Sequence, residues 1–160
     1  MRCFVLFLAV ILFLASGSLA QSKVADDKCQ GLDEKASALA SQYKELRLRR
    51  RQLPEGKFDR ELNDKLSGVL TALGRELGHP PYTKDVIVGC LGEPDALRTE
   101  KRMGGFLGVY HRELKKAGRK VEERSDREYL IYFWRGWHDF LFFISEDGSI
   151  VDHGWWFAYE

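Results

Sequence analysis

Histidine and carboxylate side chains recur in one aromatic stretch near the C-terminus, residues 134–156, with the sequence WRGWHDFLFFISEDGSIVDHGWW. Arg135, His138 and Asp139 surround a single predicted turn, and a histidine beside a carboxylate is the minimum requirement for general acid and base catalysis. Successive residues of a strand point to opposite faces of a sheet. We therefore expect Arg135 and His138, rather than His138 and Asp139, to lie opposite each other, and the three side chains could equally serve only to lock the turn.

His153 lies among aromatic residues, where a hydrogen-bonded core histidine is more common than a catalytic one. The chain has no GxSxG motif, and Gly104-Gly105 with Gly108 lacks the preceding strand and following helix of a phosphate-binding loop. No histidine or cysteine spacing is typical of a metal site. We therefore assign no catalytic residue, metal or cofactor, and keep a small secreted hydrolase using His138 or His153 with a carboxylate as the alternative function.

Two turn signals, Gly136-Trp137 and Asp147-Gly148, predict three antiparallel strands from Tyr129 onward. In the register that these turns imply, both faces of the sheet are mostly apolar, although an antiparallel sheet in water usually has one polar face. Such a sheet has either two covering layers or one exposed apolar surface. The residues that we expect on the open side and its adjoining turn, as contacts for a partner, are Tyr132, Trp134, Trp137, Asp139 and Trp156.

The elements before these strands are predicted to be helical. Apolar residues recur at helical spacing from Leu32 to Leu46 and again from Leu62 to Leu77, and Pro54 and Gly56 separate the two stripes. Asp59 is a plausible N-cap for the second helix, and Thr83 for a short third helix from Lys84 to Leu91 that ends at Gly92. These helices can cover one face of the sheet, whereas residues 99–128 or a partner chain would have to cover the other.

The N-terminus has the layout of a cleavable signal peptide, in which Arg2 precedes an apolar run and small residues end at Ala20. We therefore predict a signal peptide over residues 1–20 and a single α+β domain over 21–160, with a helical hairpin over 21–78 and a helix plus sheet over 79–160. Loss of Arg2 leaves equal numbers of basic and acidic residues. This balance argues against nucleic-acid binding or membrane attachment of the mature chain.

The mature chain has two cysteines, Cys29 and Cys90. In a secreted protein such an even pair predicts a disulfide bond. The alternative is that Cys90 is a buried helical thiol, because Val86 and Cys90 lie four residues apart on one helix face. The arginine-rich run Arg47–Arg51 at the predicted end of the first helix is typical of a solvated basic helix terminus, and it also resembles the cleavage motif of processing proteases.

Two short segments carry a family resemblance over residues 82–152. The segment Thr83–Asp95, TKDVIVGCLGEPD, and the segment Phe143–Val151, FISEDGSIV, resemble the helix-turn and the final hairpin of the small lipoproteins of the bacterial outer-membrane barrel-assembly machinery. The same fold occurs in the β-lactamase-inhibitor-protein group. The resemblance implies helices on one face of a small antiparallel sheet whose open face binds other proteins. This chain departs from the lipoproteins in its first helix, its insertion between Asp95 and Glu128, and its lack of a lipid-anchor cysteine.

The sequence thus predicts an α+β fold in which a helical hairpin and a short third helix pack on one face of an antiparallel sheet of three or four strands. The predicted function is a secreted, non-enzymatic protein-binding or inhibitor-like module that uses an aromatic-rich sheet face, with another protein as partner. A purely structural alternative is that the aromatic residues form the core and the protein acts through other surface features.

Overall fold

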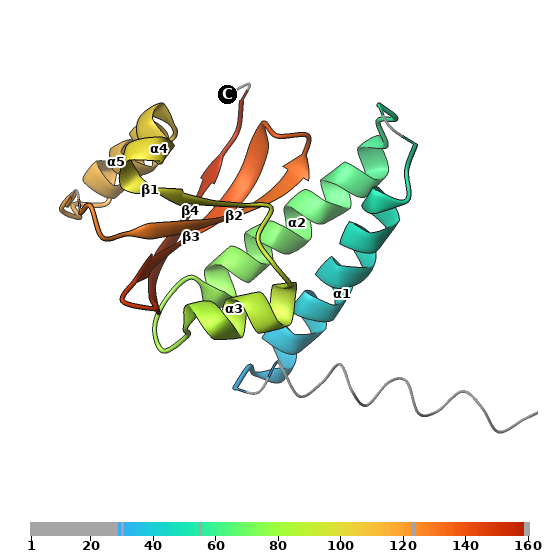
Figure 1. Ribbon diagram of the computed structural model, residues 1–160, viewed down its shortest axis with the longest axis horizontal. Helices are drawn as coiled ribbons and strands as arrows, with labels where there is room; N and C mark the ends of the chain where they lie inside the picture. The colour runs from blue at the N-terminus through green and yellow to red at the C-terminus, as the bar shows by residue number, and fades with distance from the viewer. Residues whose placement is uncertain (1–28, 30, 55, 123, 159–160) are drawn as a thin grey trace, which may run out of the picture.

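The computed structural model describes residues 29, 31–54, 56–122 and 124–158. The fold is α+β: three helices precede and flank an antiparallel sheet of four strands in the order β1-β2-β3-β4, and a group of short helices is inserted between β1 and β2 (Figure 1). The predicted fold class is confirmed. The predicted signal peptide lies outside the described residues.

The helical hairpin consists of α1, Glu34–Arg51, and α2, Arg60–Leu77. Each begins at an aspartate whose side chain satisfies a backbone amide of the first turn. Asp33 accepts a hydrogen bond from Ala36 N at 2.7 Å, and Asp59 accepts one from Leu62 N at 3.0 Å. The predicted cap at Asp59 is therefore confirmed.

The third helix, α3, spans Lys84–Leu91, as predicted. Thr83 caps its N-terminus through a hydrogen bond from Val86 N at 3.4 Å, and Gly92 follows its last residue with a φ of 80°. A positive φ at this position favours glycine. The helix packs against α1 and leads the chain to the edge of the sheet.

The sheet consists of β1, Ala96–Thr99; β2, Glu128–Arg135; β3, Asp139–Glu146; and β4, Ser149–Trp156. The predicted hairpin turn between β3 and β4 is confirmed, since Asp147 and Gly148 both have positive φ values, 49° and 80°. This is the pattern of the two-residue turn whose twist matches that of the adjoining strands.

Two details of the predicted register are wrong. Arg135 pairs with Asp139 rather than His138, because the turn between β2 and β3 contains three residues, Gly136 to His138. In the second hairpin, Ser145 pairs with Ile150 but Ile144 pairs with Asp152. The extra residue forms a bulge, and a one-residue insertion exchanges the faces to which all later side chains point.

The face of the sheet that carries Leu130, Tyr132, Leu141 and Phe143 is covered by α1, α2 and α3, as predicted. The opposite face is covered as well. Here α4, Glu100–Met103, the 3-10 helix η2, Gly104–Phe106, and α5, Leu107–Lys116, lie across the strands on the side away from the hairpin (Figure 1). The expectation of an open sheet face is therefore wrong, because residues 99–128 supply the second layer.

The predicted disulfide between Cys29 and Cys90 is not formed. Burial, followed by a hydrogen bond with the Cys29 side chain, raises the pKa of the Cys90 thiol to about 12. Disulfide formation requires a thiolate, and burial opposes the thiolate at Cys90. The alternative of a buried helical thiol describes Cys90 correctly.

None of the helices within the described residues is both long and apolar enough to cross a membrane.

Candidate functional site

The predicted binding residues do not form one accessible face. Tyr132 is fully buried and donates a hydrogen bond from its hydroxyl to Gly92 O at 3.1 Å, and Trp134 is only 3% exposed. Both belong to the core beneath the helical hairpin. Trp156 points to the other face because of the β4 bulge, and its ring packs 5.0 Å from that of Phe106.

Asp139 is also buried, with 4% of its surface exposed. One oxygen forms an ion pair with Arg135 Nε at 2.9 Å, and the other accepts a hydrogen bond from Ala158 N at 2.9 Å. Asp139 therefore fixes the start of β3 and the chain after β4. Arg135 and Asp139 therefore lock the turn, which was the alternative to a catalytic role.

Trp137 differs from the other predicted residues because 68% of it is exposed. It lies in the turn between β2 and β3, and its ring centroid is 3.8 Å from that of His138. The turn is held by Arg50 at the end of α1, which donates hydrogen bonds to Phe133 O at 2.6 Å and Gly136 O at 3.2 Å. Trp137 is thus an exposed aromatic side chain on an anchored backbone.

A groove of about 360 Å³ lies next to this turn, between the start of α2 and the ends of the strands, and we call it the turn-end groove. Phe58, which is 61% exposed, stands at one side of it. The rings of Trp134 and Phe157, 5.2 Å apart, supply buried and half-buried aromatic surface. The complete lining is Phe58, Arg60, Asn63, Asp64, Ser67, Trp134, Arg135, Asp139 and Phe157.

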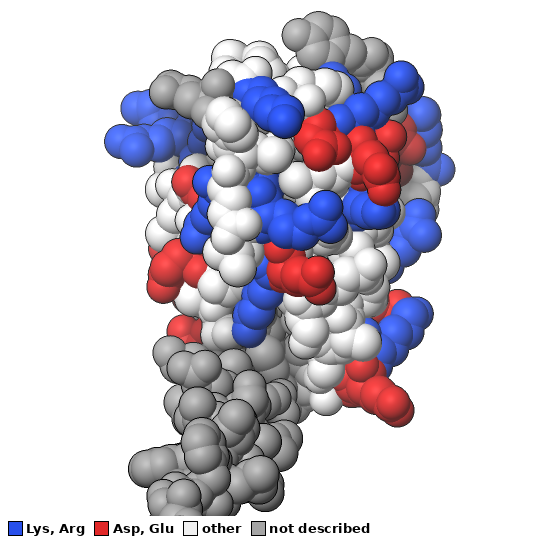
Figure 2. All heavy atoms as spheres, turned by 90° about the vertical axis from the view of Figure 1, so that its right-hand side faces the viewer, with Lys and Arg blue, Asp and Glu red and all other residues white. Residues whose placement is uncertain are grey.

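Arginines concentrate around this end of the molecule. A second hollow of about 200 Å³ is lined by Arg47, Arg50, Arg51, Asp95 and Phe133. In Figure 2, Lys and Arg side chains gather in the upper part of the face, toward the end of α1, with acidic side chains between them. Arg50 bonds to carbonyl oxygens, so these contacts hold the guanidinium without neutralising its charge. The predicted solvated basic end of α1 is therefore in part a structural clamp.

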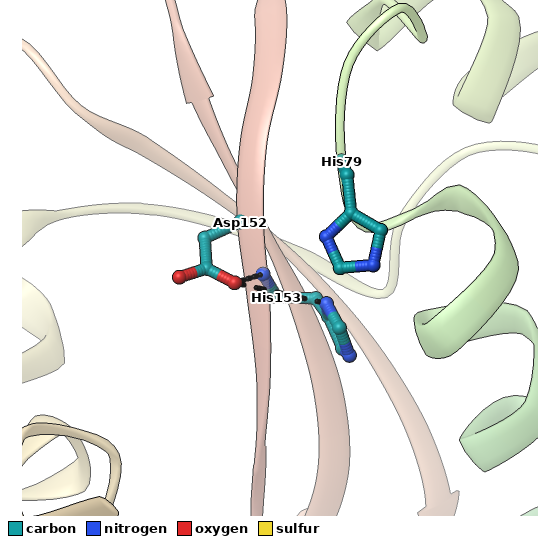
Figure 3. A group of neighbouring side chains, drawn as sticks. All are labelled: His79, Asp152 and His153. Carbon is teal, nitrogen blue, oxygen red and sulfur yellow. Dashed lines mark hydrogen bonds and ion pairs between the residues drawn. The ribbon is translucent and has the colours of Figure 1, made fainter. Parts of the chain in front are cut away.

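A second group of polar side chains lies at the other histidine of the aromatic stretch. His79, Asp152 and His153 each offer one ligand-type atom, and these atoms all lie within 4.8 Å of one another (Figure 3). His79 follows α2, whereas Asp152 and His153 belong to β4. Sequence spacing gave no signal for this group, because His79 is distant in the chain and the bulge changes the face of His153.

His153 is held in a narrow space between β4 and α2. Its side chain is 10% exposed, and its ring centroid is 5.1 Å from that of His79. A Cβ atom on Gly78 would lie 2.0 Å from His153 Nδ1, and one on Gly74 would lie 2.9 Å from Cδ2. Burial lowers the pKa of His153, the nearby His79 also lowers it, and Asp152 opposes this shift. The ring is therefore held in its neutral form.

Asp152 is the polar centre of the opposite side of β4. Its Oδ2 accepts hydrogen bonds from the Tyr110 hydroxyl and from Arg119, both at 2.7 Å. Its Oδ1 accepts one from the His153 backbone N–H at 2.8 Å and lies 3.8 Å from His153 Nδ1. Burial, followed by the hydrogen bond to Asp152, raises the pKa of Tyr110. Tyr110 therefore stays a hydrogen-bond donor at neutral pH.

Comparison with protein families found no matching family model, and neither the curated proteins nor the solved structures provided a match. The function must accordingly be inferred from the arrangement of the residues.

Proposed function

We propose that this chain is a secreted, non-enzymatic protein-binding module that recognises its partner through the turn-end groove and Trp137. The predicted role is thereby kept, but its location moves from the sheet face to the end of the molecule. The partner is expected to offer an apolar side chain for the groove and acidic groups for the surrounding arginines.

The observation that carries this proposal is the exposure of Trp137, at 68%, on a turn that Arg50 holds by two hydrogen bonds. An exposed indole ring on a fixed backbone loses little entropy when it becomes buried in an interface. Tryptophan and arginine are also the residues most enriched among those that dominate binding energy. The Arg135–Asp139 ion pair beside the ring adds a polar rim.

The groove supplies a second feature, a hollow beside the turn whose lining combines aromatic rings with polar and charged side chains. Phe58 is exposed at its edge, and Phe157 lies within it. Hollows that contain aromatic rings can accept the anchoring side chain of a partner. The resemblance to the β-lactamase-inhibitor-protein group agrees with a binding role, although the sheet face that binds in that group is covered here.

The test is differential capture. Tag-free mature chain is immobilised and exposed to the secretions of its source, alongside Trp137→Ala and Phe58→Ala variants. Leu97→Ala is the matched control, because Leu97 is an exposed apolar residue, 47% accessible, at the edge strand β1. Proteins captured by the wild type are identified by mass spectrometry, and their affinities are then measured with purified partner.

We expect at least one partner whose affinity falls by about tenfold or more with Trp137→Ala and is unchanged by Leu97→Ala. The proposal fails if the wild type, Trp137→Ala and Phe58→Ala all bind the same proteins with equal affinity.

A small hydrolase is the second candidate, and the observation that favours it is the neutral His153 next to the Asp152 carboxylate. His153 is preferred to His138 because a second histidine, His79, lies with its ring centroid 5.1 Å from that of His153, although Asp152, like Asp139, is held by an arginine. A panel of ester, peptide and glycoside substrates tests this candidate. Turnover that is lost in His153→Gln and kept in His138→Ala would replace the binding proposal with a hydrolytic one.

A further inference from the structure

The group formed by His79, Asp152 and His153 has a composition that the protein-binding role does not require. Two imidazoles and one carboxylate are the donor set of many zinc sites with three protein ligands. The atoms come from two separate parts of the chain, the segment after α2 and the strand β4, so binding a metal would join them.

His79 presents its Nδ1 lone pair. Its Nε2 lies 3.1 Å from Arg75 O, and since a carbonyl oxygen can only accept, Nε2 carries the proton. The remaining nitrogen, Nδ1, is thus unprotonated in the neutral ring. Metal-binding histidines commonly donate their second ring N–H to a backbone carbonyl in this way, which fixes both the tautomer and the ring orientation.

His153 presents a buried nitrogen without an ordinary hydrogen bond. Its Nδ1 is inaccessible to solvent and makes no hydrogen bond of ordinary geometry with the described residues, although a weak hydrogen bond with the Gly78 backbone raises the pKa of the ring. An unsatisfied buried polar atom costs about 1–3 kcal/mol and calls for an explanation. The ring is nine-tenths buried, and the glycines of α2 leave just enough space for it.

Asp152 is oriented by partners that leave one oxygen close to His153. Tyr110 and Arg119 both bind Oδ2, whereas Oδ1 lies against the β4 backbone, 3.8 Å from His153 Nδ1 on the other side of the strand (Figure 3). The backbone N–H of His153 uses one lone pair of Oδ1 and leaves the second available. Fixed carboxylate ligands of metals have the same kind of outer hydrogen bonds.

We propose that His79, Asp152 and His153 bind a divalent transition-metal ion, with Zn²⁺ as the best match. Tetrahedral zinc with ligand distances of about 2.1 Å separates its ligand atoms by about 3.4 Å. The widest separation here, 4.8 Å, must therefore close by somewhat more than about 1 Å. His79 is exposed and lies at the start of the loop after α2, so it can supply this movement, and water would complete the coordination.

The test uses tag-free mature chain with Zn²⁺ by calorimetry and with Co²⁺ by visible absorption, which reports the coordination directly. We expect one ion per chain. His79→Gln should weaken binding by at least about tenfold, and Tyr110→Phe, which loosens Asp152, should weaken it to a smaller extent. The double variant His111→Gln/His138→Gln removes the other two histidines and should bind like the wild type.

His79→Gln is the decisive variant because His79 is exposed and its change leaves the core intact. Should His153→Gln fold poorly, the conclusion still stands on His79. The proposal is overturned if neither ion binds at one per chain, if His79→Gln binds as tightly as the wild type, or if the double control loses binding. These outcomes are independent of partner capture at the turn-end groove, so the two proposals can fail separately.

Discussion

Two long helices of 18 residues each, with the shorter α3, cover one face of the sheet, whereas three short segments of 4, 3 and 10 residues cover the other. The helical face is filled largely from the helices, by leucines of α2 such as Leu66, Leu70 and Leu73. The second face is filled largely from the sheet itself, by Tyr129, Phe140 and Phe142. The covering helices contribute two buried residues, Met103 of α4 and Leu107 of α5.

The comparison teaches that large strand side chains reduce the amount of covering structure that a sheet face needs. Gly154 illustrates how closely the second layer approaches: a Cβ atom there would lie 2.5 Å from Phe142 Cζ and 2.9 Å from Tyr110 Cδ2. Contacts this short would force side chains to move. At this point α5 therefore approaches the sheet about as closely as α2 does at Gly74, where a Cβ atom would lie 2.8 Å from Leu141 Cδ1.

The largest expected effect tests this equivalence with two neighbouring residues of β3. Phe143 points to the hairpin and Phe142 to the short helices, and both are fully buried. Each replacement by alanine should reduce the free energy of unfolding by about 3–5 kcal/mol, measured by urea denaturation. A cost for Phe142→Ala below about 1 kcal/mol would mean that the second layer is loose in solution, and the comparison would break.

A smaller effect distinguishes the polar contacts of the two faces. Tyr110 donates its hydroxyl to the charged Asp152 on the second face, and Tyr132 donates to the neutral Gly92 carbonyl on the hairpin face. Bonds to charged groups contribute more, so Tyr110→Phe should cost about 2 kcal/mol and Tyr132→Phe about 1 kcal/mol. Equal costs in urea denaturation would show that solvent near α5 weakens the Tyr110 bond.

Alkaline pH should destabilise the fold through groups on both faces. Burial raises the pKa of Cys90 to about 12 and raises the pKa of Tyr132 and Tyr129 above the ordinary tyrosine value of 10.0. The unfolded chain therefore releases these protons first, so stability is complete below about pH 9 and falls as the pH rises above it.

The measurement is urea denaturation at about pH 8 and about pH 10.5. Tyr129→Phe, on the second face, and Tyr132→Phe, on the hairpin face, should each make the stability less dependent on pH over this interval. A pH dependence that only the hairpin variant alters would show that the second face admits water.

The first three helices and the Asp147-Gly148 turn could be predicted because they depend on local chemistry. Asp59 and Thr83 cap their helices, and the positive φ values of Asp147 and Gly148 follow from the preferences of an Asp-Gly turn. The bulge beyond Ile144 could not be predicted, because it depends on packing rather than on a turn motif. The one extra residue in β4 decides to which faces His153 and Trp156 point. Because of it, Trp156 lies on a different face from Tyr132 and Trp134, and nothing in the sequence indicated that His153 lies near His79.

The covering of the second face escaped prediction for a related reason. The segment 99–128 is rich in charge, and its few apolar residues, including Met103 and Leu107, are buried because the strand aromatics reach up to them. Sequence pattern gives the apolar stripe of one element but not the depth of the surface that it meets. Exposure of a sheet face therefore cannot be judged from the number of helices available.

The smallest expected change in stability belongs to the turn, and it separates the two tryptophans that the sequence could not distinguish. Trp134 is 3% exposed beneath the hairpin, whereas Trp137 is 68% exposed. Trp134→Ala should cost about 3–5 kcal/mol, and Trp137→Ala should change the free energy of unfolding by less than about 0.5 kcal/mol. A large cost at Trp137 would mean that its contact with His138 holds the turn together. A loss of partner binding in Trp137→Ala would then result from misfolding of the turn rather than from removal of a binding residue.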